Sequence, residues 1–162
     1  FAPPADAVAA ADVAVLALPF GTLADALPPI ADAASGRLVI DATNPVGPGL
    51  THGLGSQRSG SQVVAELLPD SRVAKAFSVY GFENFASAPA RPDGLRAVMP
   101  FATDDEQART ELSGLLDQIG WEPFDAGGLA AAVDLEHLTL LWVRHVRAGG
   151  NPPQLTWAAL RS

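Results

Sequence analysis

The side chains best suited to hold a ligand follow three apolar runs of this chain. They are Pro19, Phe20, Gly21 and Thr22 after the first run and Thr43, Asn44 and Pro45 after the second, and the third run ends at Phe77. Asn44 offers a donor and an acceptor to a carboxamide, and Pro45 keeps its backbone extended. The turn at Phe20 opens a helix, whose first backbone amides suit an anionic group or a ribose. Taken singly, the first two turns fit ordinary strand-to-helix or Asn turns equally well.

Charged side chains near these runs suggest further chemistry. Lys75 lies within an apolar strand, so we expect it to pair with a buried carboxylate rather than to sit at the sheet edge. Asp41, at a strand end, is expected to cap nearby amides rather than to titrate in catalysis. His52 and Arg58 lie on a long loop within reach of an acidic ligand group, although a lone loop histidine is more often solvated than catalytic.

The aromatic residues after the third run fit two different roles. Tyr80, Phe82 and Phe85 form either the wall of a planar ligand's pocket or a hydrophobic cluster under their loop. Glu136 and His137 are neighbours in a helix and point apart, so we expect no dyad. The sequence has no metal-ligand spacing and no nucleophile elbow, so we expect no metal site and assign no catalytic acid or base.

The hydrophobic pattern predicts an alternation of strands and helices that would position these residues. Strands are expected at residues 13–18, 38–42, 72–77, 96–102 and 122–125. Helices are expected at 4–11, 21–35, 59–68, 103–119 and 129–147, the last burying Leu135, Leu138, Leu141, Trp142 and Val146. Capping boxes are expected at Ser59 with Gln62 and at Thr103 with Glu106. This order is typical of an α/β fold with a Rossmann-like, doubly wound and mainly parallel sheet.

The composition narrows the class of protein. The chain has 162 residues, 48% of them hydrophobic, which suffices for one domain with a core. Its net charge of -8 argues against a nucleic-acid partner, because phosphate binding needs clustered Lys and Arg. The absence of cysteine favours a cytoplasmic location. The apolar stretch 129–143 is interrupted by Asp134, Glu136 and His137, so we expect no membrane span.

Four blocks of the sequence, at residues 15–20, 40–45, 72–77 and 120–129, resemble the NADP oxidoreductases that depend on the deazaflavin coenzyme F-420. That family is in turn similar to the nucleotide-binding domain of membrane ferric reductases. The resemblance implies a Rossmann domain that holds NADP against a deazaflavin or flavin ring for direct hydride transfer. It assigns the cofactor contacts to Leu18, Pro19, Phe20, Thr43, Asn44, Pro45 and Phe77. No side-chain acid or base is required, since both redox partners are cofactors.

Two departures from that family lead to further expectations. No G-x-G-x-x-G turn precedes Val13, so we interpret residues 1–162 as a single partial NAD(P)-binding domain whose first βαβ portion is missing, with a C-terminal helical segment at 127–162. The strand at Val13 would then form an unpaired, aggregation-prone edge. This polypeptide would bind NADP weakly or not at all. Ser78 stands where related sequences usually carry Asn.

Other functions remain open at this level. The same scaffold fits a flavin-linked or imine reductase relative, and it also fits a non-catalytic nucleotide-binding or regulatory module. We expect small-molecule cofactors as partners. Residues 129–157 carry two Trp and many Leu, which suggests a homodimer formed through the C-terminal helices.

Overall fold

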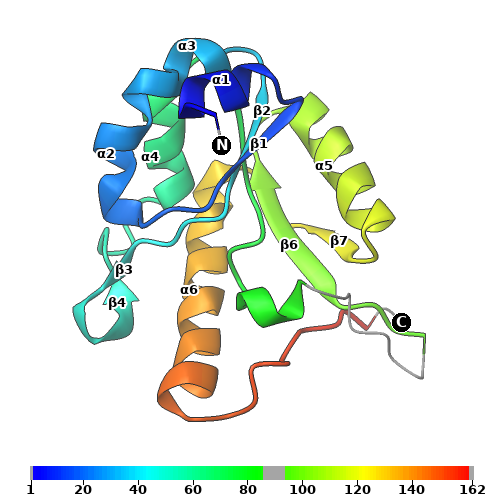
Figure 1. The fold of residues 1–162 in the computed structure, drawn as a ribbon. Helices are drawn as coiled ribbons and strands as arrows, with labels where there is room; N and C mark the ends of the chain where they lie inside the picture. Colours follow the sequence, from blue (N-terminus) through cyan, green and yellow to red (C-terminus); the bar gives the residue numbers. More distant parts are fainter. Residues whose placement is uncertain (1, 86–93, 161–162) are drawn as a thin grey trace.

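A five-stranded sheet forms the centre of the computed structural model, which describes residues 2–85 and 94–160 (Figure 1). Its strands, in spatial order, are β1 (Val13–Leu16), β2 (Leu38–Asp41), β5 (Arg72–Lys75), β6 (Val98–Thr103) and β7 (Glu122–Asp125). β1, β2 and β5 are parallel, β6 is antiparallel to β5, and β7 is parallel to β6. The predicted Rossmann-like, mainly parallel sheet is confirmed. β1, β2 and β5 end at the same edge of it.

Helices cover both faces of the sheet. They are α1 (Pro4–Ala9), α2 (Leu23–Ala26), α3 (Ala31–Ala34), α4 (Gly60–Leu67), α5 (Glu106–Gln118) and α6 (Ala132–Val143), which continues as a π-helix over Arg144–Ala148. Short 3-10 helices lie at Phe20–Thr22, Pro28–Ile30, Pro48–Leu50, Phe82–Asn84 and Leu129–Ala131. Within residues 2–85 and 94–160, no helix is long and apolar enough to cross a membrane.

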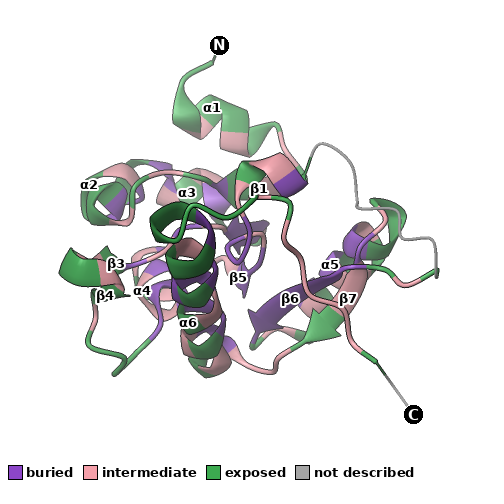
Figure 2. Ribbon diagram, turned by 90° about the horizontal axis from the view of Figure 1, so that it is seen from below, coloured by how far each residue is buried: buried purple, intermediate pink, exposed green. Residues whose placement is uncertain are grey.

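The core has two parts, one on each face of the sheet. Leu38 and Ile40 of β2 pack with residues of α5 and α6, whereas Val39 packs with residues of α2 and α4. This split follows from the strand geometry, because successive side chains point to opposite faces. Figure 2 shows β5 and β6 buried between helices whose outer faces are exposed. At the edge, β1 is less protected, and Val15 is 53% exposed.

The two predicted capping boxes have different outcomes. The box at the start of α4 is confirmed, because Ser59 Oγ accepts from Gln62 N and Gln62 Oε1 accepts from Ser59 N. The box predicted at Thr103 is wrong. Thr103 is the last residue of β6 and donates its hydroxyl to Val73 O, while Asp105 caps α5 by accepting from Ala108 N. Thr103 and Asp105 can both cap a helix, but the Thr103 side chain bonds to β5, so Asp105 provides the cap.

The long C-terminal helix spans the predicted residues as a 3-10 turn, α6 and a π-helix, but one of its predicted core residues is wrong. Leu141 is 50% exposed, whereas Leu140 is buried. Leu140 lies one turn after Glu136, which is also buried, and residues four apart share a helix face. The buried face of α6 therefore includes a carboxylate, which the hydrophobic pattern did not reveal.

The long connection between β2 and α4 contains a small hairpin. Its strands are β3 (Val46–Gly47) and β4 (Thr51–His52), which are antiparallel. Arg144 Nη2 donates to Leu50 O at 2.6 Å, so the far end of α6 holds the hairpin tip. Figure 1 shows α6 lying between this hairpin and β6.

The segment after α6 returns along the sheet in extended form. Val98 N at the start of β6 donates to Trp157 O at 2.9 Å, and Trp142 Nε1 donates to Leu155 O at 3.0 Å. Leu155 and Trp157 pack against the core of their own chain. The tryptophans that suggested a dimer are thus engaged within the chain, while Leu141 and Leu160 are exposed.

Candidate functional site

A pocket of about 530 Å³ opens at the ends of β1 and β2. It is lined by residues 19–21, 44–48 and Gly53, which belong to the turn after β1, the turn after β2 and the hairpin. We call it the strand-end pocket. Clefts beyond the carboxyl ends of parallel strands are the usual ligand sites of open α/β sheets.

The structure brings four of the seven predicted contact residues to this pocket. Pro19, Phe20, Asn44 and Pro45 line it. Thr43 is buried behind them, where its backbone N–H and hydroxyl both donate to Asp41 Oδ1. Leu18 lines a different cavity. Phe77 follows β5 and packs edge-on against Phe85, with 5.9 Å between ring centroids.

Asn44 carries an unused acceptor. Its Nδ2 donates to Ser78 O at 3.1 Å, but its Oδ1 is buried and has no hydrogen-bond partner among residues 2–85 and 94–160. Ser78 Oγ, at the adjoining strand end, is unpaired in the same way within these residues. Buried polar atoms without partners are rare in folded proteins, and a bound ligand is one reason for them. Asn44 Oδ1 therefore suits an incoming N–H donor.

Phe77 has a strained backbone at the end of β5. Its φ is +59°, in the left-handed region that bulky residues rarely adopt. Such outliers persist where the surrounding structure fixes them, and they are common beside ligand sites. The strain turns the chain sharply from buried Ala76 to Ser78, whose carbonyl receives the Asn44 amide.

Behind the pocket lies a group of four buried ionisable side chains, Asp41, His52, Lys75 and Glu136, which we call the buried charge cluster. Lys75 Nζ lies 3.1 Å from Asp41 Oδ2 and 3.1 Å from Glu136 Oε1, and it also donates to Thr43 O. The predicted pairing of Lys75 with a buried carboxylate is confirmed, with two carboxylates in place of one.

Asp41 has the capping role predicted for it. Its Oδ1 accepts from Thr43 N at 2.8 Å and from Thr43 Oγ at 2.7 Å. Its Oδ2 accepts from Ser61 Oγ at 2.7 Å as well as from Lys75. The carboxylate thereby fixes the turn that leads into Asn44 and joins it to the first turn of α4.

Glu136 joins three elements to α6. Its Oε2 lies 2.8 Å from His52 Nε2 in β4, and its Oε1 accepts from Gly60 N at the start of α4 as well as from Lys75 at the end of β5. Sequence reasoning missed this residue. Two features of the sequence could have indicated it: Lys75 in an apolar strand requires a buried carboxylate, and Glu136 lies one turn before Leu140 in an apolar helix.

His52 is buried, so the expectation of a solvated loop histidine is wrong. Its Nδ1 accepts from Leu54 N and from Ser56 N, each at 3.2 Å. Nδ1 therefore carries no proton, and Nε2–H donates to Glu136. Arg58 instead lies at the surface, paired with Glu66 at 2.8 Å and not turned toward a ligand site.

Gly60 marks where the pocket wall meets the cluster. A Cβ at this position would lie 2.9 Å from Phe20 Cε2, 3.0 Å from Glu136 Oε1 and 3.3 Å from Pro45 Cδ. Two wall residues and the cluster carboxylate thus approach one point. Only glycine fits there without displacing one of them.

The aromatic residues after β5 form a hydrophobic cluster. Tyr80 stacks on Trp121 with ring centroids 5.4 Å apart, and Phe85 lies 6.0 Å from the same ring. Tyr80 donates its hydroxyl to Val98 O at 2.8 Å, and burial raises the pKa of Tyr80 to about 12. Phe82 is 77% exposed. These contacts favour a packed cluster over a ligand wall.

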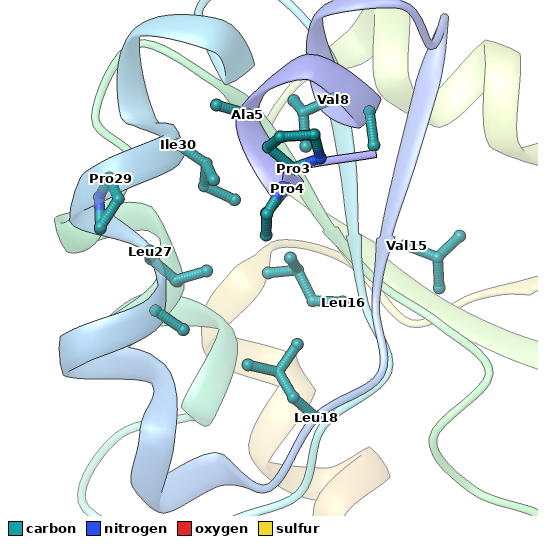
Figure 3. A pocket seen from close by; sticks show the side chains of 12 residues that line it. Pro3, Pro4, Ala5, Val8, Val15, Leu16, Leu18, Leu27, Pro29 and Ile30 are labelled. Atoms are coloured by element: carbon teal, nitrogen blue, oxygen red, sulfur yellow. The ribbon is translucent and has the colours of Figure 1, made fainter. Parts of the chain in front are cut away.

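A second cavity of about 600 Å³ lies between α1, β1 and the helical segment 26–30 (Figure 3). Leu16, Leu18, Leu27 and Ile30 face it, and the rest of its lining is Pro, Ala and Val. These side chains carry no hydrogen-bonding group that could orient a ligand. Ligand sites usually combine apolar walls with a few placed polar groups, so the strand-end pocket is the better candidate.

Known proteins share parts of this sequence and its fold. Residues 2–45 match the family described as NADP oxidoreductase, coenzyme F420-dependent. The metalloreductase STEAP3 of Rattus norvegicus is 30% identical over 111 residues, which are 68% of this chain and 22% of that protein. The chain therefore spans about a fifth of the length of this curated relative.

Two solved structures have the same fold over nearly the whole chain. One, from Arthrobacter sp. FB24, is described as an F420-dependent NADP reductase and superposes with a TM-score of 0.82 at 22% identity, covering 92% of this chain and 69% of the other. The protein SMa0349 from Sinorhizobium meliloti superposes with a TM-score of 0.70 at 24% identity, covering 96% and 70%. In sequence and fold, the chain resembles the coenzyme F420-dependent NADP oxidoreductases.

Proposed function

We propose that this chain is the nucleotide-binding part of an NADP-dependent oxidoreductase and that the nicotinamide end of NADP occupies the strand-end pocket. The observation that carries this proposal is Asn44, which lines the pocket and whose buried Oδ1 has no partner among the described residues. Residues 2–45, which match the NADP oxidoreductase family, include Pro19, Phe20, Asn44 and Pro45 of the pocket.

In this proposal the protein acts by positioning. Asn44 Oδ1 accepts a hydrogen bond from the carboxamide, while Phe20 and Pro45 pack against the ring. When bound, NADP exchanges a hydride with a second redox cofactor, for which we propose a deazaflavin such as coenzyme F-420, or a flavin. No residue that lines the pocket has a titratable side chain, which suits chemistry carried entirely by cofactors.

The nicotinamide half of the cofactor is the right probe, because weak binding of the whole dinucleotide is expected. NMR titration with nicotinamide mononucleotide at millimolar concentration should shift the amide signals of Phe20, Asn44, Val46, Gly47 and Gly53. Adenosine 2′,5′-bisphosphate, the other half, should leave these signals in place. Asn44→Ala should reduce the nicotinamide response, and Asn151→Ala, an exposed position, should not. Absence of shifts at the pocket with the first probe would refute the proposal.

A non-catalytic nucleotide-binding module is the second candidate, since a pocket without titratable residues needs no reaction to explain it. A chain that binds nicotinamide mononucleotide but supports no hydride exchange with a deazaflavin or flavin, in the longest natural form of the protein, would favour the module. A flavin-linked or imine reductase relative, a homodimer through the C-terminal helices and a cytoplasmic location stay predictions.

A further inference from the structure

We infer that the buried charge cluster makes the strand-end pocket bind the oxidised, positively charged nicotinamide ring more tightly than the reduced, neutral ring. This inference rests on the proposed function. It concerns Asp41, His52, Lys75 and Glu136, none of which lines the pocket.

The hydrogen bonds fix the protonation of each member. Lys75 Nζ donates to three acceptors, so it holds three protons and is cationic. Both oxygens of Asp41 accept two donors each, which leaves no room for a proton on that carboxyl group. The neutral tautomer of His52 donates to Glu136 Oε2, and Glu136 Oε1 accepts from Lys75 and Gly60, so Glu136 is also ionised.

The cluster therefore has one excess negative charge, because two carboxylates face one ammonium and a neutral imidazole. Its side chains are shielded from water, and those of Lys75 and Asp41 have no exposed surface. Screening by solvent and salt is weak for buried charges. The amide of Gly60 stabilises Glu136 as the first residue of α4 but adds no net charge.

The excess charge lies directly behind the ring-binding walls. Glu136 Oε1, Phe20 Cε2 and Pro45 Cδ all approach the same point beside Gly60. On the other side, Thr43 receives Lys75 at its carbonyl and precedes Asn44 in the chain. A cationic ring in the pocket is attracted to this charge, whereas a neutral ring is not. The pocket would thus favour hydride transfer from the reduced nicotinamide to the proposed deazaflavin or flavin, since the nicotinamide ring gains its positive charge in that direction.

The test compares the dissociation constants of oxidised and reduced nicotinamide mononucleotide, measured by NMR titration of the pocket amides. Glu136→Gln removes the charge at constant size. We expect it to lower the preference for the oxidised form by about three- to tenfold, the effect of one charge across roughly 10 Å at an effective dielectric constant of about 25 to 50, between the values for the protein surface and for water. Glu66→Gln, the same change at an exposed position in α4, should leave the preference unchanged. A general loosening of the pocket in Glu136→Gln would raise the dissociation constants of the oxidised and reduced forms equally, so the ratio of the two constants would not change.

A second measurement needs only the unaltered chain. Benzamide mononucleotide has a flat aromatic ring like the oxidised cofactor but no charge, and it should bind about three- to tenfold more weakly than nicotinamide mononucleotide. Equal affinities, or a redox preference that Glu136→Gln does not change, would overturn the inference while the proposed function stands. Failure of every ring to perturb the pocket would overturn the proposed function and the inference with it.

Discussion

Lys75 Nζ lies 3.1 Å from Glu136 Oε1, and this contact joins the end of β5 to the middle of α6 across 61 residues of chain. Neither side chain is more than 1% exposed. Two buried carboxylates depend on the one ammonium, because Asp41 shares it. Removal of a single member of such a group leaves a buried charge uncompensated, which costs far more than the loss of a surface ion pair.

Lys75→Met should lower the free energy of unfolding by about 3–5 kcal/mol, because it leaves Asp41 and Glu136 facing each other without a cation. Urea denaturation followed by tryptophan fluorescence measures this change. Arg58→Met breaks the exposed pair with Glu66 and is the matched control, with an expected loss below about 1 kcal/mol. Similar losses in the two variants would show that the cluster does not hold the charges inferred for it.

Two substitutions at His52 should separate its two roles. Asn places an acceptor near the position of Nδ1, so His52→Asn should keep the amides of Leu54 and Ser56 protected from hydrogen exchange while it loses the bond to Glu136. Gln reaches the position of Nε2, so His52→Gln should keep the Glu136 bond and expose the two amides. Equal exchange rates at Leu54 and Ser56 in both variants would contradict the tautomer assigned to His52.

Stability should fall steeply above pH 10 because of Tyr80. Burial raises the pKa of Tyr80 to about 12 in the folded state from 10.0, so the unfolded chain loses the phenolic proton first. The contribution of Tyr80 to the free energy of unfolding is fully present below pH 10. It decreases by about 1.4 kcal/mol per pH unit as the pH rises toward 12. Tyr80 is the single tyrosine of the chain, so absorbance of the phenolate reports on it alone. A midpoint near 10 in the folded protein would contradict this prediction.

Gly60→Ala should weaken nicotinamide mononucleotide binding and reduce stability by about 1–3 kcal/mol, because a Cβ there overlaps Phe20 and crowds Glu136. Gly114 is the matched control. It lies inside α5 with open space around it, so Gly114→Ala should raise stability by about 0.5–1 kcal/mol through helix propensity. Thermal unfolding and the NMR titration measure both effects. Unchanged binding of nicotinamide mononucleotide in Gly60→Ala would show that Phe20 and Pro45 can move without affecting the pocket, which contradicts this prediction.

Local patterns predicted much of the fold. The apolar runs before Leu18, Thr43 and Phe77 became β1, β2 and β5, because strands of a parallel sheet that helices cover are rich in apolar side chains, and β2 is buried at all four positions. The direction of β6 could not be read in the same way. An apolar strand has the same pattern whether its neighbour runs parallel or antiparallel, so the antiparallel pairing of Ala74 with Thr103 had no local signal.

The candidate site was predictable only in part, for a similar reason. Pro19, Phe20, Asn44 and Pro45 were identified because strand ends form one edge. The partnership of His52 with Glu136 spans 84 residues and depends on how a hairpin meets a helix. Nothing near either residue indicates it. The sequence suggested that Glu136 interrupts an apolar stretch. In the structure it is buried in α6, where it pairs with Lys75 and His52.

The extended segment that follows α6 also determines when β6 and the residues after β5 can reach their folded state during synthesis. Trp157 O pairs with the first residue of β6, its N–H reaches the Tyr80 hydroxyl, and Pro153 O receives Asn84 Nδ2. These bonds link residues 153–157 to β6 and to the segment 80–84, which are translated much earlier. In a nascent chain stalled before Asn151, Tyr80 and Trp142 therefore lack their hydrogen bonds to Trp157 and Leu155. We expect chaperones at the ribosome exit to bind the apolar surface that these residues leave exposed.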